Sequence, residues 1–302
     1  MAISLQDDGV YAAHVTRPAG ARPIVELATF RAIDGSSQDQ GLEKLGKEVG
    51  ASSYRCSTLL RSGDYQMLSV EAPSVPAEEL KSAIRWRVKD MLDFQVDDAT
   101  VDVLNIPPDT QGGNRAQAMF AVAARNGIVQ TRQELMARAK IPLAAIDIPE
   151  MAQRNLSALL AQEGRGLAFL SFGSEGGLLT VTYRGELYLT RRIDVPLSQL
   201  QQAYGDALAA CHERITLELQ RSLDHFERQY GFITVARLVL SPMGETGEAL
   251  RNYLSSNLYV AAETLDLAGI LDVSRVPELA SVQAQQRYLL TLGAALREEE
   301  AA

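Results

Sequence analysis

Residues 166–193, GLAFLSFGSEGGLLTVTYRGELYLTRRI, decide the fold. Their apolar runs have the length of β-strands and are bounded by glycine turns, so the stretch predicts three consecutive strands at 167–172, 178–183 and 186–193. A glycine-rich turn after a buried strand is a place where a phosphate group can lie against backbone N–H groups. Of the two arginines near the end of the third strand, Arg191 and Arg192, we expect one to face solvent and the other an acidic neighbour.

The first 32 residues repeat this pattern in weaker form. Helix-like sequence follows both copies, at 41–49 and at 197–229. The strand-like segments of the first copy lie at 3–5, 10–15 and 23–31. A βββα unit that recurs in each half predicts two similar domains facing each other.

We therefore divide the chain into a first domain, 1–163, and a second domain, 164–302. Between the two copies lies a segment of different character, at about 73–140, which we interpret as a small subdomain inserted into the first domain. Around and within it, the apolar patterns and turn residues predict a strand at 67–72, a helix at 76–94, strands at 100–106 and 117–124, and a helix at 126–140.

The composition excludes several classes of function. The net charge of −9 argues against nucleic acid as the main partner, because binding to phosphates needs a basic face. Two distant cysteines, Cys56 and Cys211, and three scattered histidines predict reduced thiols and no metal site. No signal peptide opens the chain and no apolar run has the length of a membrane span. We expect a soluble, cytoplasmic protein that reaches the inner membrane only through a partner.

The order of these segments resembles the actin-like ATPase superfamily, in the branch of the pilus assembly protein PilM and the cell-division protein FtsA. The MshI-type proteins of mannose-sensitive haemagglutinin (MSHA) pilus biogenesis show the closest resemblance. It implies an α/β, actin-like (ribonuclease H-like) two-domain fold with a small inserted α/β subdomain in the first domain. The stretches that carry it are 75–94 (VPAEELKSAIRWRVKDMLDF), 121–156 (AVAARNGIVQTRQELMARAKIPLAAIDIPEMAQRNL), 166–193, 217–226 (LELQRSLDHF), 238–244 (LVLSPMG) and 289–297 (LLTLGAALR).

The same resemblance implies a nucleotide site that has lost part of its chemistry. In the family, each hairpin offers an acidic residue near a phosphate-binding turn; here Ser4 and Ser171 stand at those positions. Because Mg²⁺ is held through carboxylates and phosphates, we expect no ATP hydrolysis and no required cofactor. Asp7 and Asp8 are candidates for displaced metal ligands, with a solvated turn as the simpler interpretation.

Four residues retain the family's pattern on the nucleotide side and form a vestigial cofactor-binding set: Gly173, Glu218, Arg221 and Gly244. Next to Gly244, a Pro-Met pair replaces most of the paired-glycine turn that approaches the base. Glu218 and Arg221 match a helix that contacts ribose, although their spacing is equally that of an ion pair on a solvated helix face.

The resemblance further implies a groove between the inserted subdomain and the first domain. In PilM-like proteins this groove takes the cytoplasmic N-terminal peptide of a PilN-like bitopic membrane protein. The residues expected to border it are Arg85, Trp86, Phe94, Val101 and Val103. For Trp86, the sequence favours packing of the subdomain onto its own sheet over a role as a partner anchor.

These inferences predict a non-catalytic scaffold of type IV (MSHA-like) pilus biogenesis. It would bind the tail of its PilN-like partner and couple that event to a cytoplasmic assembly ATPase. Two alternatives remain open: an ATP-binding switch of the same fold, and a component of a type II secretion platform, whose related fold normally carries a membrane span.

Overall fold

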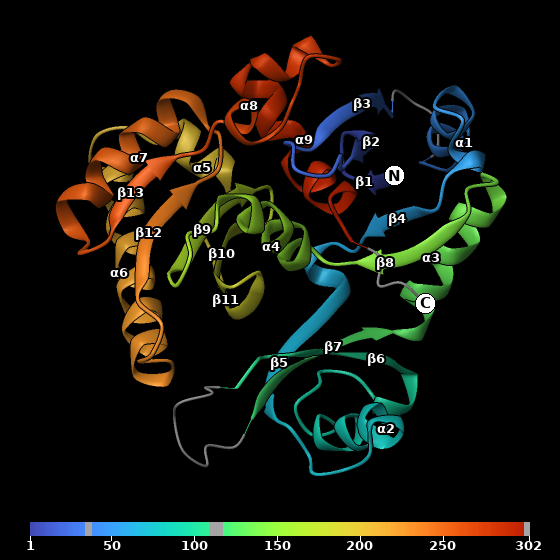
Figure 1. Cartoon of the computed structure of the whole chain (residues 1–302), viewed down its shortest axis with the longest axis horizontal. Coiled ribbons are helices and arrows are strands. Elements are labelled where there is room, and N and C mark those ends of the chain that lie inside the picture. The colour runs from blue at the N-terminus through green and yellow to red at the C-terminus, as the bar shows by residue number, and fades with distance from the viewer. Residues whose placement is uncertain (34–37, 109–116, 299–302) are drawn as a thin grey trace.

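The computed structural model describes residues 1–33, 38–108 and 117–298. Two five-stranded sheets lie side by side, and a smaller three-stranded sheet lies below them in the view of Figure 1. Within the described ranges, no helix is both long and apolar enough to cross a bilayer.

The first large sheet has the strand order β3-β2-β1-β4-β8. Its meander β1-β2-β3 is antiparallel, whereas β4 runs parallel to β1 and β8 parallel to β4. The strands are β1 (Ala2–Leu5), β2 (Gly9–Thr16), β3 (Ile24–Ala32), β4 (Cys56–Leu59) and β8 (Leu143–Asp147).

The second large sheet repeats this arrangement in the order β11-β10-β9-β12-β13. Again an antiparallel meander is followed by two strands that add in parallel. The predicted repeat of hairpin units is therefore confirmed. The strands are β9 (Gly166–Gly173), β10 (Gly176–Tyr183), β11 (Glu186–Ile193), β12 (Val235–Leu240) and β13 (Ala261–Thr264).

Helices cover the sheets and connect them (Figure 1). The α-helices are α1 (Gln38–Glu48), α2 (Ala77–Arg87), α3 (Asn126–Arg138), α4 (Pro149–Leu160), α5 (Leu197–Gln202), α6 (Asp206–Gln229), α7 (Gly244–Asn257), α8 (Leu267–Ile270) and α9 (Val282–Ala295). Short 3₁₀ turns are η1 (Ala51–Ser53), η2 (Ser62–Asp64), η3 (Val96–Asp98) and η4 (Pro277–Ala280).

The small sheet has the order β5-β7-β6, with strands β5 (Tyr65–Glu71), β6 (Ala99–Asn105) and β7 (Ala118–Arg125). One face is covered by α2, whose Ile84 is fully buried against Met119 of β7. From the other face, Phe120 packs into the core of the second half. The alternation of side chains along β7 thus joins the inserted subdomain to the rest of the molecule.

Helices α4 and α9 pack against each other, and α9 also contacts strands of the first sheet. The last helix of the chain therefore lies on a sheet built from the first residues. One buried core runs through this junction, because Tyr11 of β2, Phe169 of β9 and Leu292 of α9 belong to a single cluster.

Two predicted helices differ from the structure. The helix predicted at 76–94 ends at Arg87, because the chain beyond it turns back and the N–H of Asp93 donates to the side chain of Gln66. The segment predicted as one helix at 197–229 is split between α5 and α6. Gly205 adopts a positive φ of 55° at the break, a conformation that glycine reaches at little cost.

Candidate functional site

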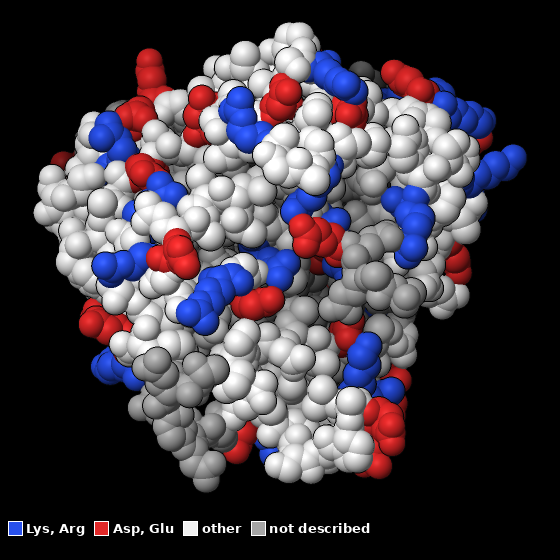
Figure 2. Space-filling model, in the orientation of Figure 1, with Lys and Arg blue, Asp and Glu red and all other residues white. Residues whose placement is uncertain are grey.

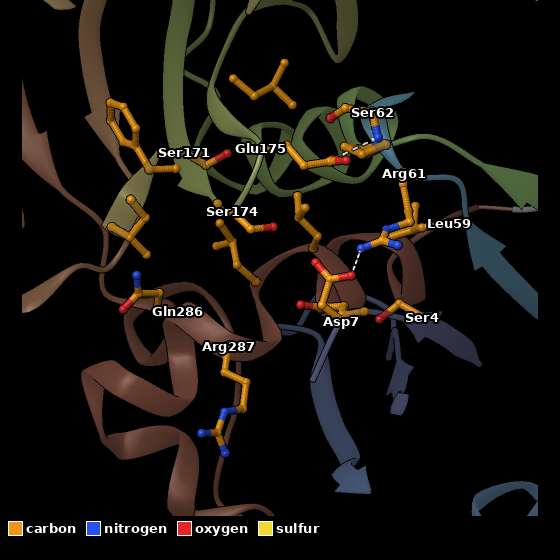
Figure 3. A pocket seen from close by; sticks show the side chains of 18 of the residues that line it. Ser4, Asp7, Leu59, Arg61, Ser62, Ser171, Ser174, Glu175, Gln286 and Arg287 are labelled. Atoms are coloured by element: carbon orange, nitrogen blue, oxygen red, sulfur yellow. Dashed lines mark hydrogen bonds and ion pairs between the residues drawn. The ribbon is translucent and has the colours of Figure 1, made fainter. Parts of the chain in front are cut away.

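A cavity of about 670 Å³ lies between the two hairpin units, and its walls come from both halves and from α9. Figure 3 shows residues that line it, with Ser4 and Asp7 on the first hairpin and Ser171 and Glu175 on the second. This is the position at which the sequence predicts the vestigial nucleotide site. The wider surface in Figure 2 carries basic side chains interspersed with acidic ones on the face shown.

At the first hairpin, Ser4 occupies the strand position where the family resemblance places an acid. Its Oγ lies 2.7 Å from Oγ1 of Thr291 on α9, and both residues are buried. The two hydroxyls satisfy each other, since each can donate or accept. A carboxylate in place of Ser4 would remove one hydroxyl of this pair and would have to be desolvated at a buried position.

At the second hairpin, Ser171 is buried and donates a 2.7 Å hydrogen bond to Oε1 of Gln153 on α4. Ser4 and Ser171 line the same cavity, so the two expected acid positions do meet across the cleft. Both are occupied by neutral hydroxyls that are bonded to helices of the protein itself.

The carboxylates of the first turn are engaged by protein donors. Asp7 forms an ion pair with Arg61 (Figure 3). Asp8 accepts a 2.6 Å hydrogen bond from the phenol of Tyr11. Burial raises the pKa of Tyr11 above its ordinary value and the bond to Asp8 raises it further, so this phenol remains a donor.

A second acidic centre lies beside the cavity, where Glu150 of α4 is only 2% exposed. Its Oε1 lies 2.7 Å from a guanidinium nitrogen of Arg192, and its Oε2 accepts from the phenol of Tyr65. Burial raises the pKa of Tyr65 well above its ordinary value, and the charge of Glu150 raises it further. The prediction that one arginine of the hairpin meets an acidic neighbour is confirmed for Arg192, which pairs with Glu150 although 40% of its side chain is exposed, and Arg191 is exposed too.

The donor set as it lies does not fit a magnesium nucleotide. No group of three or more His, Cys, Asp or Glu side chains that could hold a metal occurs among the described residues. In the first turn, the N–H groups of Gln6 and Gly9 donate to each other's carbonyl oxygens, at 2.9 and 3.4 Å, so they are not directed at a phosphate. The neighbouring carboxylates would also repel one.

Of the four residues predicted on the nucleotide side, one is part of the cavity wall and three lie on α6 and at the start of α7. Gly173 lines the cavity. Glu218 and Arg221 lie on α6, where they form an i, i+3 ion pair at 3.2 Å, and Arg221 is exposed. Gly244 begins α7 with a positive φ of 58°. None of these last three is among the residues that line the cavity.

Three of the residues predicted on the partner side lie on α2 and the turn after it. Trp86 is 67% exposed, so its predicted packing onto the small sheet is wrong. Its ring instead lies 5.6 Å from the ammonium group of Lys89. Arg85 is 3.7 Å from Asp97, and the guanidinium of Arg125 stacks 4.5 Å from the centroid of the Phe94 ring.

The other two predicted partner residues, Val101 and Val103, lie on β6, which is an edge strand of the small sheet. Both side chains are partly buried and pack against the cluster under α2. The N–H of Val103 donates to the carboxylate of Asp102 at 2.9 Å, and the same oxygen pairs with Lys81 at 2.7 Å. The backbone N–H of Val103 at this edge is therefore bonded to a side chain and not to a neighbouring strand.

Sequence reasoning missed several residues of the cleft, namely Gln153, Glu150, Ser62 and Thr291. Each lies far along the chain from its partner. Helix α4 carries five polar residues, and no sequence signal distinguishes Gln153 as the one that is fully buried under the sheet. Buried polar side chains are normally hydrogen-bonded, so such a residue implies a polar partner without identifying it.

Two sheets of identical strand order, a cleft between their hairpins and a closing helix define the actin-like ATPase fold. No protein-family model matches the sequence, and no curated protein matches it significantly. Among solved structures, the chain is similar to the PilM–PilN type IV pilus biogenesis complex, with a TM-score of 0.75 and 18% identity over 97% of this chain and 96% of that one.

Two further structures extend the comparison. A Bacteroides thetaiotaomicron protein of actin-like ATPase fold and unknown function gives a TM-score of 0.51, with 12% identity over 93% of this chain and 95% of that one. The cytoplasmic domain of EpsL, an inner membrane component of the type II secretion system of Vibrio cholerae, gives 0.43 with 12% identity, over 66% of this chain and 73% of that one. The likenesses with TM-scores of 0.75 and 0.51 show the fold alone, because the identities are only 18% and 12%.

Proposed function

We propose that this protein is a non-catalytic, PilM-like scaffold of type IV pilus biogenesis, of the MSHA type, at the cytoplasmic face of the inner membrane. Its task is to bind the N-terminal tail of a PilN-like membrane protein and to present the resulting assembly to a cytoplasmic assembly ATPase. The likeness to the PilM–PilN complex supports this, because it covers 97% of the chain and so includes the inserted subdomain.

The observation that carries the proposal is the exposure of Trp86 on that subdomain. A tryptophan that is 67% exposed leaves a large apolar surface in water. Met91, after the same helix, is 48% exposed. Protein–protein interfaces concentrate their binding energy in such aromatic and Met side chains, with arginines beside them, and Arg85 and Arg87 flank Trp86.

The edge strand β6 supports an extended peptide as the bound form. An edge strand offers backbone N–H and C=O groups to which a further strand can add. Here the N–H of Val103 is held by Asp102, a side chain that an incoming backbone carbonyl can displace. Asp97, Asp98 and Asp102 are exposed along this edge. A basic peptide would compete with Arg85 for Asp97 and with Lys81 for Asp102. Cytoplasmic segments beside membrane spans are enriched in Lys and Arg, so the charges are complementary.

The absence of catalysis is part of the proposal and rests on the cleft. Ser4 and Ser171 replace the expected acids and are bonded to Thr291 and Gln153. Asp7 is paired with Arg61. A scaffold needs the shape of the actin-like fold and its partner surface, and neither depends on nucleotide hydrolysis.

The test is calorimetric titration of the full chain with a synthetic peptide from the N-terminus of a PilN-like protein. We expect measurable heat and a rise in melting temperature. Trp86→Ala should weaken binding by at least about tenfold, the effect of a modest interface hot spot. Tyr204→Ala is the matched control, because Tyr204 is an 83% exposed aromatic residue in the second half. Absent heat with an unchanged melting temperature would refute partner binding, and equal effects of both variants would refute the assigned surface.

A further inference from the structure

Side chains from the second half reach across the mouth of the cleft and meet at Ser62 of the first half. Ser62 begins the short turn η2 between β4 and β5. Its backbone N–H donates a 3.0 Å hydrogen bond to Oε2 of Glu175, which lies on the β9–β10 turn (Figure 3). Its hydroxyl oxygen accepts from Arg192 of β11. Both contacts join segments more than one hundred residues apart in sequence.

Arg192 extends this junction into the interior. The same guanidinium donates to the phenol of Tyr65 at 2.6 Å and to the buried Glu150 at 2.7 Å. Tyr65 is the first residue of β5, so the junction is continuous with the small sheet. A buried carboxylate needs a positive partner, which makes Arg192 costly to withdraw from the first half.

The first hairpin also contacts the chain at the start of η2, through the residue before Ser62. Arg61, directly before Ser62, pairs with Asp7 in the β1–β2 turn (Figure 3). Arg61 therefore binds Asp7 of the first hairpin, and the adjacent Ser62 binds Glu175 of the second hairpin. The family resemblance would place phosphate groups between these two turns, with oxygens accepting from both.

We propose that Glu175 and Arg192 of the second half bind Ser62 of the first half as a clasp that holds the cleft closed without nucleotide, and that the Arg61–Asp7 pair fixes the turn on which Ser62 lies. The carboxylate of Glu175 accepts from a backbone N–H as a phosphate oxygen would, and Arg192 supplies the positive charge. The chain's own side chains thus make the link between the halves, and no bound ligand is needed for it. This inference concerns the cleft alone and stands independently of the partner peptide.

The chemistry favours a clasp that opens reversibly. Glu175 is exposed and Asp7 and Arg61 are largely solvated, so those contacts are weakened by salt. Salt screens the pair between Arg192 and the buried Glu150 less, so we expect this contact to remain when the contacts of Ser62 open. Opening therefore begins at Ser62 and Glu175, at the mouth of the cleft.

Hydrogen exchange of the Ser62 amide, measured in the full chain, reports directly whether the clasp is formed, because this N–H group donates to Glu175. We expect protection in the wild type and at least about tenfold faster exchange in Glu175→Ala, the size of one lost hydrogen bond. Core amides such as Val181 should keep their rates, which separates local opening from loss of fold. Arg192→Lys, which keeps a charge for Glu150 but shortens the reach to Ser62, should give an intermediate increase.

The control is Arg191→Ala, a change at the exposed neighbour of Arg192, which should leave Ser62 protected. Unprotected Ser62 in the wild type would overturn the proposal, and so would unchanged exchange in Glu175→Ala. Adding Mg-ATP to the wild type gives a further arm: unchanged exchange supports the clasp, whereas marked slowing would show that nucleotide, and not the chain, provides the link.

Discussion

The hydroxyl of Ser171 donates a 2.7 Å hydrogen bond to Oε1 of Gln153, and this bond joins the second hairpin to helix α4. The amide nitrogen of Gln153 in turn donates to the carbonyl of Phe169 at 2.7 Å and to the hydroxyl of Thr180 at 2.8 Å. The orientation of Gln153 is therefore fixed by two strands of the sheet, and it presents an acceptor to position 171. That position needs a donor.

Ser171→Asp should destabilise the protein without creating catalysis. An ionised aspartate has no proton to give to Gln153, and it would be desolvated at a buried position. We expect a loss of about 3 kcal/mol in the free energy of unfolding. Ser171→Ala, which only leaves the acceptor unpaired, should cost about 1 kcal/mol. Urea unfolding measures both, and equal stability of Ser171→Asp and wild type would contradict the hydrogen-bond assignment.

Gly293→Ala should disrupt the packing of α9 on α4. A Cβ atom at Gly293 would lie 2.3 Å from the carbonyl oxygen of Ala152, closer than any real contact. The helices would have to separate, at a cost of about 3 kcal/mol. Gly127→Ala in α3 is the control: a Cβ there meets no atom of the described chain within 4 Å, and alanine favours a helix, so stability should stay equal or rise. Similar losses in both variants would argue against the close crossing.

Acid should weaken the fold through His212. This residue is 5% exposed, its Nε2 has no hydrogen-bond partner among the described residues, and burial lowers its pKa below the ordinary 6.5. The unfolded chain then binds the proton more readily than the folded one. The contribution of neutral His212 to the free energy of unfolding is therefore fully present above pH 6.5, and it is lost as the pH falls through the lower folded-state pKa.

His212→Gln should remove this part of the pH dependence. Unfolding measured between pH 7.5 and pH 5 should show a smaller loss of stability for this variant than for the wild type. His225→Gln, at an exposed position of the same helix, is the control and should retain the wild-type loss. A wild-type slope in His212→Gln would assign the acid sensitivity to another group.

Arg192→Met should destabilise the protein because it leaves Glu150 buried without a cation. We expect a loss of about 3 kcal/mol, at the low end for a broken buried pair, since Tyr65 still donates to the carboxylate. The double variant Glu150→Gln with Arg192→Met should recover most of this loss, because no buried charge remains. Thermal or urea unfolding of the three proteins tests it, and an unrecovered double variant would mean that Arg192 acts through packing.

Millimolar Mg-ATP should leave the melting temperature unchanged within about 1 °C. A ligand present at one hundred times its Kd stabilises the folded state by about 2.7 kcal/mol, which a thermal scan detects easily. The same scan with MgSO₄ alone controls for salt. A clear rise specific to nucleotide would instead favour an ATP-binding switch and would count against the replacement of its phosphates by Glu175.

Local sequence was sufficient for the strands and helices whose patterns are complete. The three strands around Gly173 and Gly185 follow from apolar runs of strand length bounded by glycine. Two strands, β4 and β13, were not predicted, since no glycine-bounded hairpin pattern surrounds them and each is specified by its neighbours in the sheet. The helix predicted to run to residue 94 ends at Arg87 for a similar reason, because the chain after it bonds through Asp93 to Gln66 of strand β5.

The sequence by itself determined that the chain repeats a hairpin unit, carries an inserted subdomain and has serines where acids were expected. The first two properties follow from periodicity and turn residues, which act over short stretches of chain, whereas the expected acid positions are what the family resemblance implies. Only the tertiary structure decided what those serines do. Ser4 meets Thr291 across 287 positions, Glu175 meets Ser62 across 113, and Trp86 turns out to face solvent. Hydrogen-bond partners and exposure depend on how distant segments pack, and no local pattern encodes that packing.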